Sequence, residues 1–196
     1  MARVAALLAL AAVTGTAPAI AQNQSATTSM PVIGSAPQIC ALQPPRMAPG
    51  AQTNFRGLSG ETLQIDQMAD STTLAANAAS ASIQFEAVCS FPHRLRLESQ
   101  NNGLWRTSEL ATIPTGGFTY AVPYRAEVSW AGVNTALDAD ALSRRVSDRR
   151  VTIDRPGAGT LELRIEIQQG ASNVRANAPV IAGYYGDTLR IVLEPQ

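Results

Sequence analysis

The sequence predicts an all-β protein: an antiparallel β-sandwich of immunoglobulin-like size with short helical excursions. Three observations lead to this prediction. About seven short segments alternate apolar and polar residues with a period of two, turn residues separate them, and two cysteines fall in early segments where a disulfide can join two strands. No internal repeat of about 20 to 50 residues is present, which argues against a solenoid or a propeller.

The first 21 residues have the pattern of a secretory signal peptide. Arg3 supplies the positive charge, residues 4–13 form an apolar run too short to span a bilayer, and residues 19–21 (Ala-Ile-Ala) fit the small-residue pattern that signal peptidase accepts. We expect cleavage before Gln22 and export of the mature chain. No later segment approaches the roughly 20 apolar residues of a transmembrane helix, so we expect no membrane insertion.

The charge balance of the chain is neutral. Fifteen basic residues, all of them arginine, stand against fifteen acidic residues. This balance argues against binding to nucleic acid, and the absence of lysine leaves no residue for a Schiff base. The arginines of residues 144–155 form the only charge cluster, but Asp138, Asp140, Asp148 and Asp154 lie among them or close by. We interpret this segment as a solvated loop; a contact site for an acidic partner, lipid headgroup or polysaccharide is the alternative.

The N-terminal third of the mature chain begins with a flexible leader, residues 22–38, rich in Ser, Thr, Ala and Pro. The domain is expected over residues 39–196. Its first strand is predicted at residues 39–42, and further strands at 55–58 and 61–68. Residues 70–80 are small and of low complexity, which indicates a mobile loop whose alanines would tolerate a short helix.

Residues 82–90 alternate cleanly and place Cys89 on the core face of a strand. In an exported chain with two cysteines, a disulfide between Cys40 and Cys89 is expected. Zinc is the alternative, but a structural zinc needs four ligands and His93 is the only histidine.

Two more alternating segments follow, at residues 93–99 and 118–130, and Asn102-Gly103 indicates a turn after the first of them. Pro123 lies within the second segment. Because proline has no N–H to donate to a ladder, we expect that strand to be at a sheet edge or bulged there.

The last third of the chain contains the predicted helical excursion. Residues 134–150 carry acids early and arginines late, which favours one or two helical turns. Strands are then predicted at residues 151–153 and 161–167. The final strand, residues 189–193, follows two glycines that flank a pair of tyrosines.

Catalytic chemistry is poorly supported. A nucleophilic triad would have to use His93, which we interpret as exposed or locally hydrogen-bonded. Tyr120, Tyr124 and Trp130 share one face with valines, which favours core packing over a carbohydrate-stacking platform. The sequence predicts no catalytic residues, no metal site and no cofactor.

Several segments together resemble a known family. Cys40 lies in a first strand, VCS ends at Ser90, HRLRLES follows, FTYAVPY lies in mid-chain, and AGYYGDTLRIVL lies near the end. This arrangement is similar to the secreted spore-coat-protein-U-like domains, which are pilin-like subunits of archaic, Csu-type chaperone–usher systems. The most specific element is GxYxDT, which falls on Gly183, Tyr185, Asp187 and Thr188.

The resemblance implies an immunoglobulin-like sandwich that lacks its last strand. Such a subunit would fold with a periplasmic chaperone, pass through an outer-membrane usher and join neighbouring pilin subunits by donor-strand exchange. Leu189, Ile191 and Leu193 would line the groove that receives the donor, and the leader would be the donor, although Pro31, Gly34 and Pro37 interrupt its alternation. A self-contained exported module that binds a surface glycan or protein is the second hypothesis, and an enzyme is the third.

Overall fold

The computed structural model describes residues 26–108 and 116–196, so the predicted signal peptide lies outside the described residues. Contacts divide the chain after Ser35. Residues 26–35 form no helix or strand, and Met30, Val32 and Ile33 are 82%, 91% and 92% exposed. Residues Ala36–Gln196 form a compact unit, called the β unit below.

The β unit is built from strands, and its described residues contain no helix. Accordingly, no helix in the described ranges has the length and apolar character to cross a bilayer. The strands are β1 (Cys40–Leu42), β2 (Arg46–Thr53), β3 (Phe55–Ser59), β4 (Thr62–Ile65), β5 (Ala79–Cys89), β6 (His93–Ser99), β7 (Leu104–Arg106), β8 (Ala121–Val122), β9 (Tyr124–Trp130), β10 (Val133–Ala139), β11 (Ser147–Ile153), β12 (Gly157–Ile167), β13 (Tyr185–Gly186) and β14 (Leu189–Pro195).

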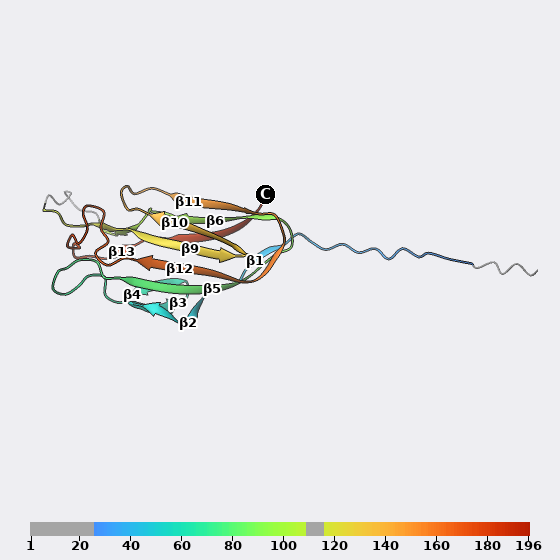
Figure 1. Ribbon diagram of the computed structural model, residues 1–196, viewed down its shortest axis with the longest axis horizontal. Coiled ribbons are helices and arrows are strands. Elements are labelled where there is room, and N and C mark those ends of the chain that lie inside the picture. The colour runs from blue at the N-terminus through green and yellow to red at the C-terminus, as the bar shows by residue number, and fades with distance from the viewer. Residues whose placement is uncertain (1–25, 109–115) are drawn as a thin grey trace, which may run out of the picture. The chain divides into compact units, whose positions relative to one another are not determined.

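The strands pair antiparallel in two main sheets (Figure 1). The first sheet has the order β1-β5-β12-β9-β10, with β2 also paired to β5, and the second has the order β11-β6-β14. A small sheet, β13-β7-β8, and the hairpin β3-β4 complete the described strands. The all-β prediction is therefore confirmed at the level of antiparallel sheets, and the arrangement is consistent with a β-sandwich.

The core lies between the two main sheets and follows the predicted period of two. On β9 the side chains alternate strictly between buried and exposed, and on β6 Leu95 and Leu97 are fully buried. These leucines join Val128 of β9 and Leu161 of β12 in one apolar cluster. Burial of these branched side chains, about 1.5–3 kcal/mol each, is the main force that holds the sheets together.

The predicted helical turns at residues 134–150 are wrong. This segment contains β10 and the start of β11, joined by a turn. Thr135, Leu137 and Ala139 alternate on the buried face of β10 and pair with β9, so the tertiary contacts of the apolar face prevail over the charge pattern. The neighbouring arginines form surface ion pairs, Arg145 with Asp140 and Arg150 with Asp148.

The prediction of a sheet edge or a bulge at Pro123 is confirmed in part, because the ladder breaks there and β8, which ends at Val122, is the edge strand of the small sheet. Pro123 separates β8 from β9; β8 pairs with β7, whereas β9 is an internal strand between β12 and β10. The missing N–H is accommodated because the chain changes sheets at the proline. Two strands were not predicted: β2, in which Pro49-Gly50 interrupts the alternation, and β7, which has three residues.

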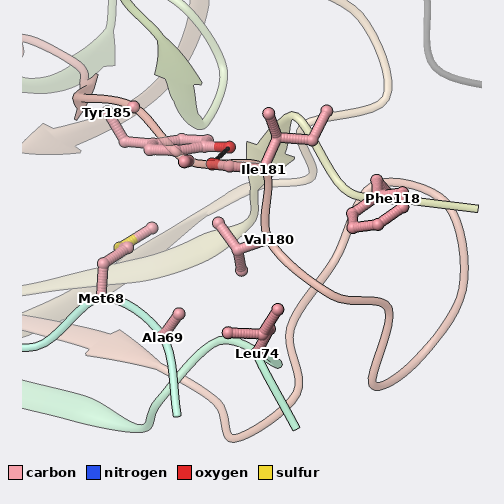
Figure 2. Close-up of a pocket in the computed structure, with 9 residues that line it drawn as sticks. Met68, Ala69, Leu74, Phe118, Val180, Ile181 and Tyr185 are labelled. Carbon is pink, nitrogen blue, oxygen red and sulfur yellow. Dashed lines mark hydrogen bonds between the residues drawn. The ribbon is translucent and has the colours of Figure 1, made fainter. Parts of the chain in front are cut away.

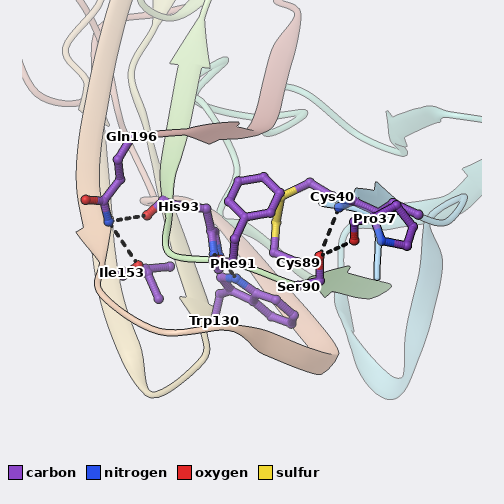
Figure 3. The surroundings of a disulfide bond; sticks show 10 residues. Pro37, Cys40, Cys89, Ser90, Phe91, His93, Trp130, Ile153 and Gln196 are labelled. Carbon is purple, nitrogen blue, oxygen red and sulfur yellow. Dashed lines mark hydrogen bonds between the residues drawn. A yellow bond between two sulfur atoms is a disulfide. The ribbon is translucent and has the colours of Figure 1, made fainter. Parts of the chain in front are cut away.

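The predicted disulfide between Cys40 and Cys89 is confirmed, and it joins β1 to β5 (Figure 3). Close by, His93 is fully buried. Trp130 Nε1 donates to His93 Nε2 at 2.8 Å, which leaves His93 Nδ1 to donate to Phe91 O at 2.9 Å. Both ring nitrogens are therefore satisfied, and the histidine ties the β5–β6 turn to β9.

We predict that Trp130→Phe lowers the free energy of unfolding more than Trp105→Phe does. The first variant leaves the buried His93 Nε2 without a donor, which costs about 1–3 kcal/mol beyond the loss of ring volume. Trp105 is the matched control because its buried Nε1 has no hydrogen-bond partner to lose. Urea unfolding of both variants measures the difference, and equal losses would show that the His93–Trp130 bond contributes nothing.

Candidate functional site: the open edge of strand β14

Strand β14 is paired on one side only. It runs antiparallel to β6, from Leu189 opposite Ser99 to Pro195 opposite His93. Among the described residues no other strand pairs with β14, and it ends the β11-β6-β14 sheet. Its second edge therefore presents backbone N–H and C=O groups without a ladder partner.

The side chains of β14 that face the core are incompletely covered. Leu189, Ile191 and Leu193 pack against the core cluster but are only half-buried. Their direct neighbours on β6, in contrast, are 0% exposed: Ser99, Leu97 and Leu95. The core-facing side chains are thus fully covered on β6 and only partly covered on the neighbouring strand β14.

The incomplete layer is bordered by the edge of the first sheet. β1 contacts β14 across the gap between the sheets, and Leu42 of β1 is also half-buried against the core. The other two outer strands differ. β10 buries Thr135, Leu137 and Ala139, and β11 carries the exposed charge of Arg149 at a core-facing position opposite Leu97. Among the described outer strands of the two main sheets, β14 carries the longest row of apolar core-facing side chains that are only half-buried.

Asp187 of the GxYxDT motif fixes the beginning of β14. One carboxylate oxygen accepts hydrogen bonds from Tyr124 Oη at 2.7 Å and from Ser99 Oγ. The other accepts from the backbone N–H groups of Asn101, at 2.9 Å, and Thr188, at 2.7 Å. Because Tyr124 lies on β9 and Ser99 on β6, this one carboxylate joins both main sheets at the point where β14 starts.

The other motif residues shape the approach to β14. Tyr185 Oη donates to Ile181 O at 2.8 Å and closes the loop before β13. Gly183 has φ +155°, and a Cβ there would lie 2.5 Å from Nε of Arg106. That guanidinium donates to Ala182 O at 3.0 Å, so glycine is required for the close approach.

Burial shifts the acidity of two of these tyrosines. It raises the pKa of Tyr124 well above the usual value near 10, with a smaller opposing hydrogen bond from Ser99 and a further increase from the negative charge of Asp187. Burial likewise raises the pKa of Tyr185 to about 12, against the opposing charge of Arg106. Both hydroxyls are therefore neutral donors at physiological pH.

An apolar cleft of about 610 Å³ lies beside Tyr185 (Figure 2). It was not predicted, because its lining comes from three loops that are far apart in the sequence. The signal that could have indicated it is a pair of large apolar residues in loops, Leu74 and Phe118, which are 47% and 39% exposed. The lining residues are Met68, Ala69, Leu74, Phe118, Val180, Ile181, Ala182, Gly183 and Tyr185.

The predicted site residues therefore fall in two places. Gly183, Tyr185, Asp187 and Thr188 form the connection that positions β14, and Leu189, Ile191 and Leu193 form the half-buried row on it. Within the part of the chain that the structure describes, no three potential metal ligands gather. An unpaired edge above a half-buried apolar row can add an extended peptide, which supplies main-chain hydrogen bonds and alternate apolar side chains.

Comparison with models of known protein families found no match, and comparison with curated protein sequences found none either.

We predict that Asp187→Asn destabilises the β unit by about 1–3 kcal/mol, because the carboxylate accepts four hydrogen bonds and the amide can accept only through its single oxygen. Urea unfolding measures the loss. Asp154→Asn is the control: Asp154 is exposed and is expected to change stability by less than about 0.5 kcal/mol. The proposed role of Asp187 would be wrong if both variants behaved alike.

We also predict that Tyr124 and Tyr185 ionise later than free tyrosine. In ultraviolet difference spectra Tyr185 should titrate near pH 12 and Tyr124 higher still, and Tyr124→Phe and Tyr185→Phe should each remove one late transition. The unfolded chain ionises near pH 10, so protons are lost first from the unfolded state and stability falls as the pH rises above 10. For Tyr124 the slope is about 1.4 kcal/mol per pH unit. Normal titration of both groups would contradict the buried geometry.

Proposed function

We propose that the protein is a structural subunit of a bacterial surface filament, completed by a strand from another molecule. On this proposal the β unit is an immunoglobulin-like sandwich that lacks its final strand, and β14 is the strand beside the vacant position. The observation that carries the proposal is the half-buried row Leu189, Ile191 and Leu193 on an unpaired edge, next to a fully buried row on β6.

The resemblance to spore-coat-protein-U-like domains supports the same proposal. Gly183, Tyr185, Asp187 and Thr188, the residues of its most specific motif, are those that position β14. A motif that sets the place of the last strand is expected where that strand must serve as a template. The partners on this proposal are a periplasmic chaperone, an outer-membrane usher and neighbouring subunits. The signal-peptide pattern and the disulfide fit export through the periplasm to the cell surface.

The direction of the backbone groups on β14 determines which residues of an incoming strand can form hydrogen bonds with it. Gln100 N donates to Thr188 O at 3.0 Å, so Thr188 and the alternate residues after it direct their backbone groups toward β6. Leu189, Ile191 and Leu193 then direct theirs toward the open edge. In an antiparallel partner, the residues opposite these three both face the core and provide the hydrogen bonds.

The leader satisfies this restriction despite its prolines. Met30 and Val32 share one parity of the chain, and Pro31 and Pro37 share the other. If Met30 and Val32 enter the core, both prolines turn their missing N–H away from β14, where no ladder bond is needed. Met30 and Val32 are almost fully exposed in residues 26–35, so their burial is available to drive association. We therefore propose the leader of a neighbouring subunit as the antiparallel donor strand.

A second candidate function is a self-contained exported module that binds a surface protein or glycan. The observation that favours it is the apolar cleft beside Tyr185, whose concave shape suits an apolar group of a protein partner. This candidate gives no reason for the half-buried row on β14. The filament subunit therefore explains more of the structure.

We predict that Val32→Asp abolishes self-association of the full exported chain and that Ile33→Asp leaves it intact. In the antiparallel arrangement Val32 enters the core, where an unpaired carboxylate costs several kcal/mol, and Ile33 remains in solvent. Size-exclusion chromatography with light scattering, run over a concentration series, measures the oligomers.

The two variants are matched controls, because Val32 and Ile33 are adjacent in the chain and both are more than 90% exposed in residues 26–35. Loss of association in Ile33→Asp alone would show that Ile33, and not Val32, faces the core, which would contradict the proposed antiparallel donor. No association of the unmodified chain at any concentration, with or without chaperone, would count against the filament proposal itself.

A further inference from the structure

The residues where the leader joins the β unit are fastened at several points within a short distance (Figure 3). Cys40 is bonded covalently to Cys89. Ser90 N donates to Ile39 O at 2.9 Å, and Ser90 Oγ accepts from Ile39 N at 2.9 Å and donates to Pro37 O at 3.2 Å. One serine and one disulfide thus hold residues 37–40 against the end of β5.

Without the disulfide, the hold on this segment would be weak. β1 has three residues, Cys40–Leu42, and pairs only with β5. Each of its few hydrogen bonds contributes about 1 kcal/mol net. β5, in contrast, pairs along all of Ala79–Cys89 with β12, an internal strand of the first sheet. The disulfide therefore links one of the shortest strands of the β unit to one of its most extensively paired strands.

The turn that carries Ser90 is itself anchored. Phe91 O accepts from His93 Nδ1, and His93 Nε2 accepts from Trp130 Nε1 of β9. His93 and Trp130 are buried, at 0% and 3% exposed. The β5–β6 turn is thereby tied to a second internal strand.

From this arrangement we propose that the Cys40–Cys89 disulfide and the β5–β6 turn form a tension clamp for the leader. Force applied to the leader passes through Cys40 into Cys89 and β5, and bypasses β1 and residues 43–88. The source of the tension rests on the proposed function, in which each leader is held by the next subunit. The clamp itself is a property of the single chain and can be measured without assembly.

Single-molecule pulling on the full exported chain tests the clamp. One handle is attached at the N-terminus and the other at Leu142, which is 73% exposed and lies outside β14, so that the last strand is not loaded. The disulfide spans 49 positions, so the intact bond withholds about 170 Å of extension when the chain unfolds. In the unmodified protein we expect no step before the main unfolding event.

The double variant Cys40→Ala/Cys89→Ala should show an additional early step, at lower force than the main event. Its length should be about 35 Å, which corresponds to the release of residues 36–45. Ser90→Ala is the control: it removes the Oγ hydrogen bonds and keeps the disulfide, and its first event should remain at the unmodified force.

The proposal is overturned if the double variant unfolds in one event at the unmodified force, because the hydrogen bonds of β1 would then suffice. If the double variant does not fold, the unmodified chain is held at constant force while dithiothreitol is added, and the same early step must appear on reduction. Failure of the filament proposal would leave both force traces unchanged, because neither measurement involves a second subunit.

Discussion

The ladder between β6 and β14 is the constraint on which the candidate site depends. It places Leu189, Ile191 and Leu193 beside a row on β6 that is already fully buried, so their remaining exposure lies away from β6. Asp187 sets the start of this ladder by joining β9, β6 and β14 through one carboxylate. The exposure of the row is therefore a consequence of a well-bonded arrangement and not of a loosely attached last strand.

The two outer strands of the second sheet, β11 and β14, differ in the residues at their core-facing positions. Proteins commonly protect sheet edges with charged residues that point inward. β11 carries such a residue, since Arg149 stands opposite the buried Leu97 on the core-facing side and is itself exposed. β14 belongs to the same sheet and has only apolar residues at the corresponding positions. If a strand joins this sheet as proposed, β14 is therefore the more favourable edge and β11 the less favourable one.

Features that follow from short stretches of sequence or from composition could be predicted. The alternation of residues 93–99 gave β6 with its bounds, and the cysteine parity gave the disulfide. In residues 134–150 the order of the charges resembles helix polarity and predicts one or two helical turns, and only the pairing of β10 with β9 decides otherwise. The motif residue Asp187 could be singled out by resemblance, but its bonds to Tyr124 and Ser99 span separations of 63 and 88 positions, which no spacing rule connects. The apolar cleft depends on three distant loops for the same reason.

If β14 receives a strand as proposed, its edge should be ordered before association, because any ordering that remains is subtracted from the free energy of association. β14 meets this condition at both ends by different chemistry. Asp187 holds its beginning, and beyond its end Gln196 Nε2 donates to Ile153 O of β11 at 3.2 Å, across β6. Between these fixed ends the unpaired backbone groups keep strand geometry without a partner. On the proposed function, the incoming segment therefore bears most of the ordering cost, and the prolines of the leader, which restrict its backbone, would reduce that cost.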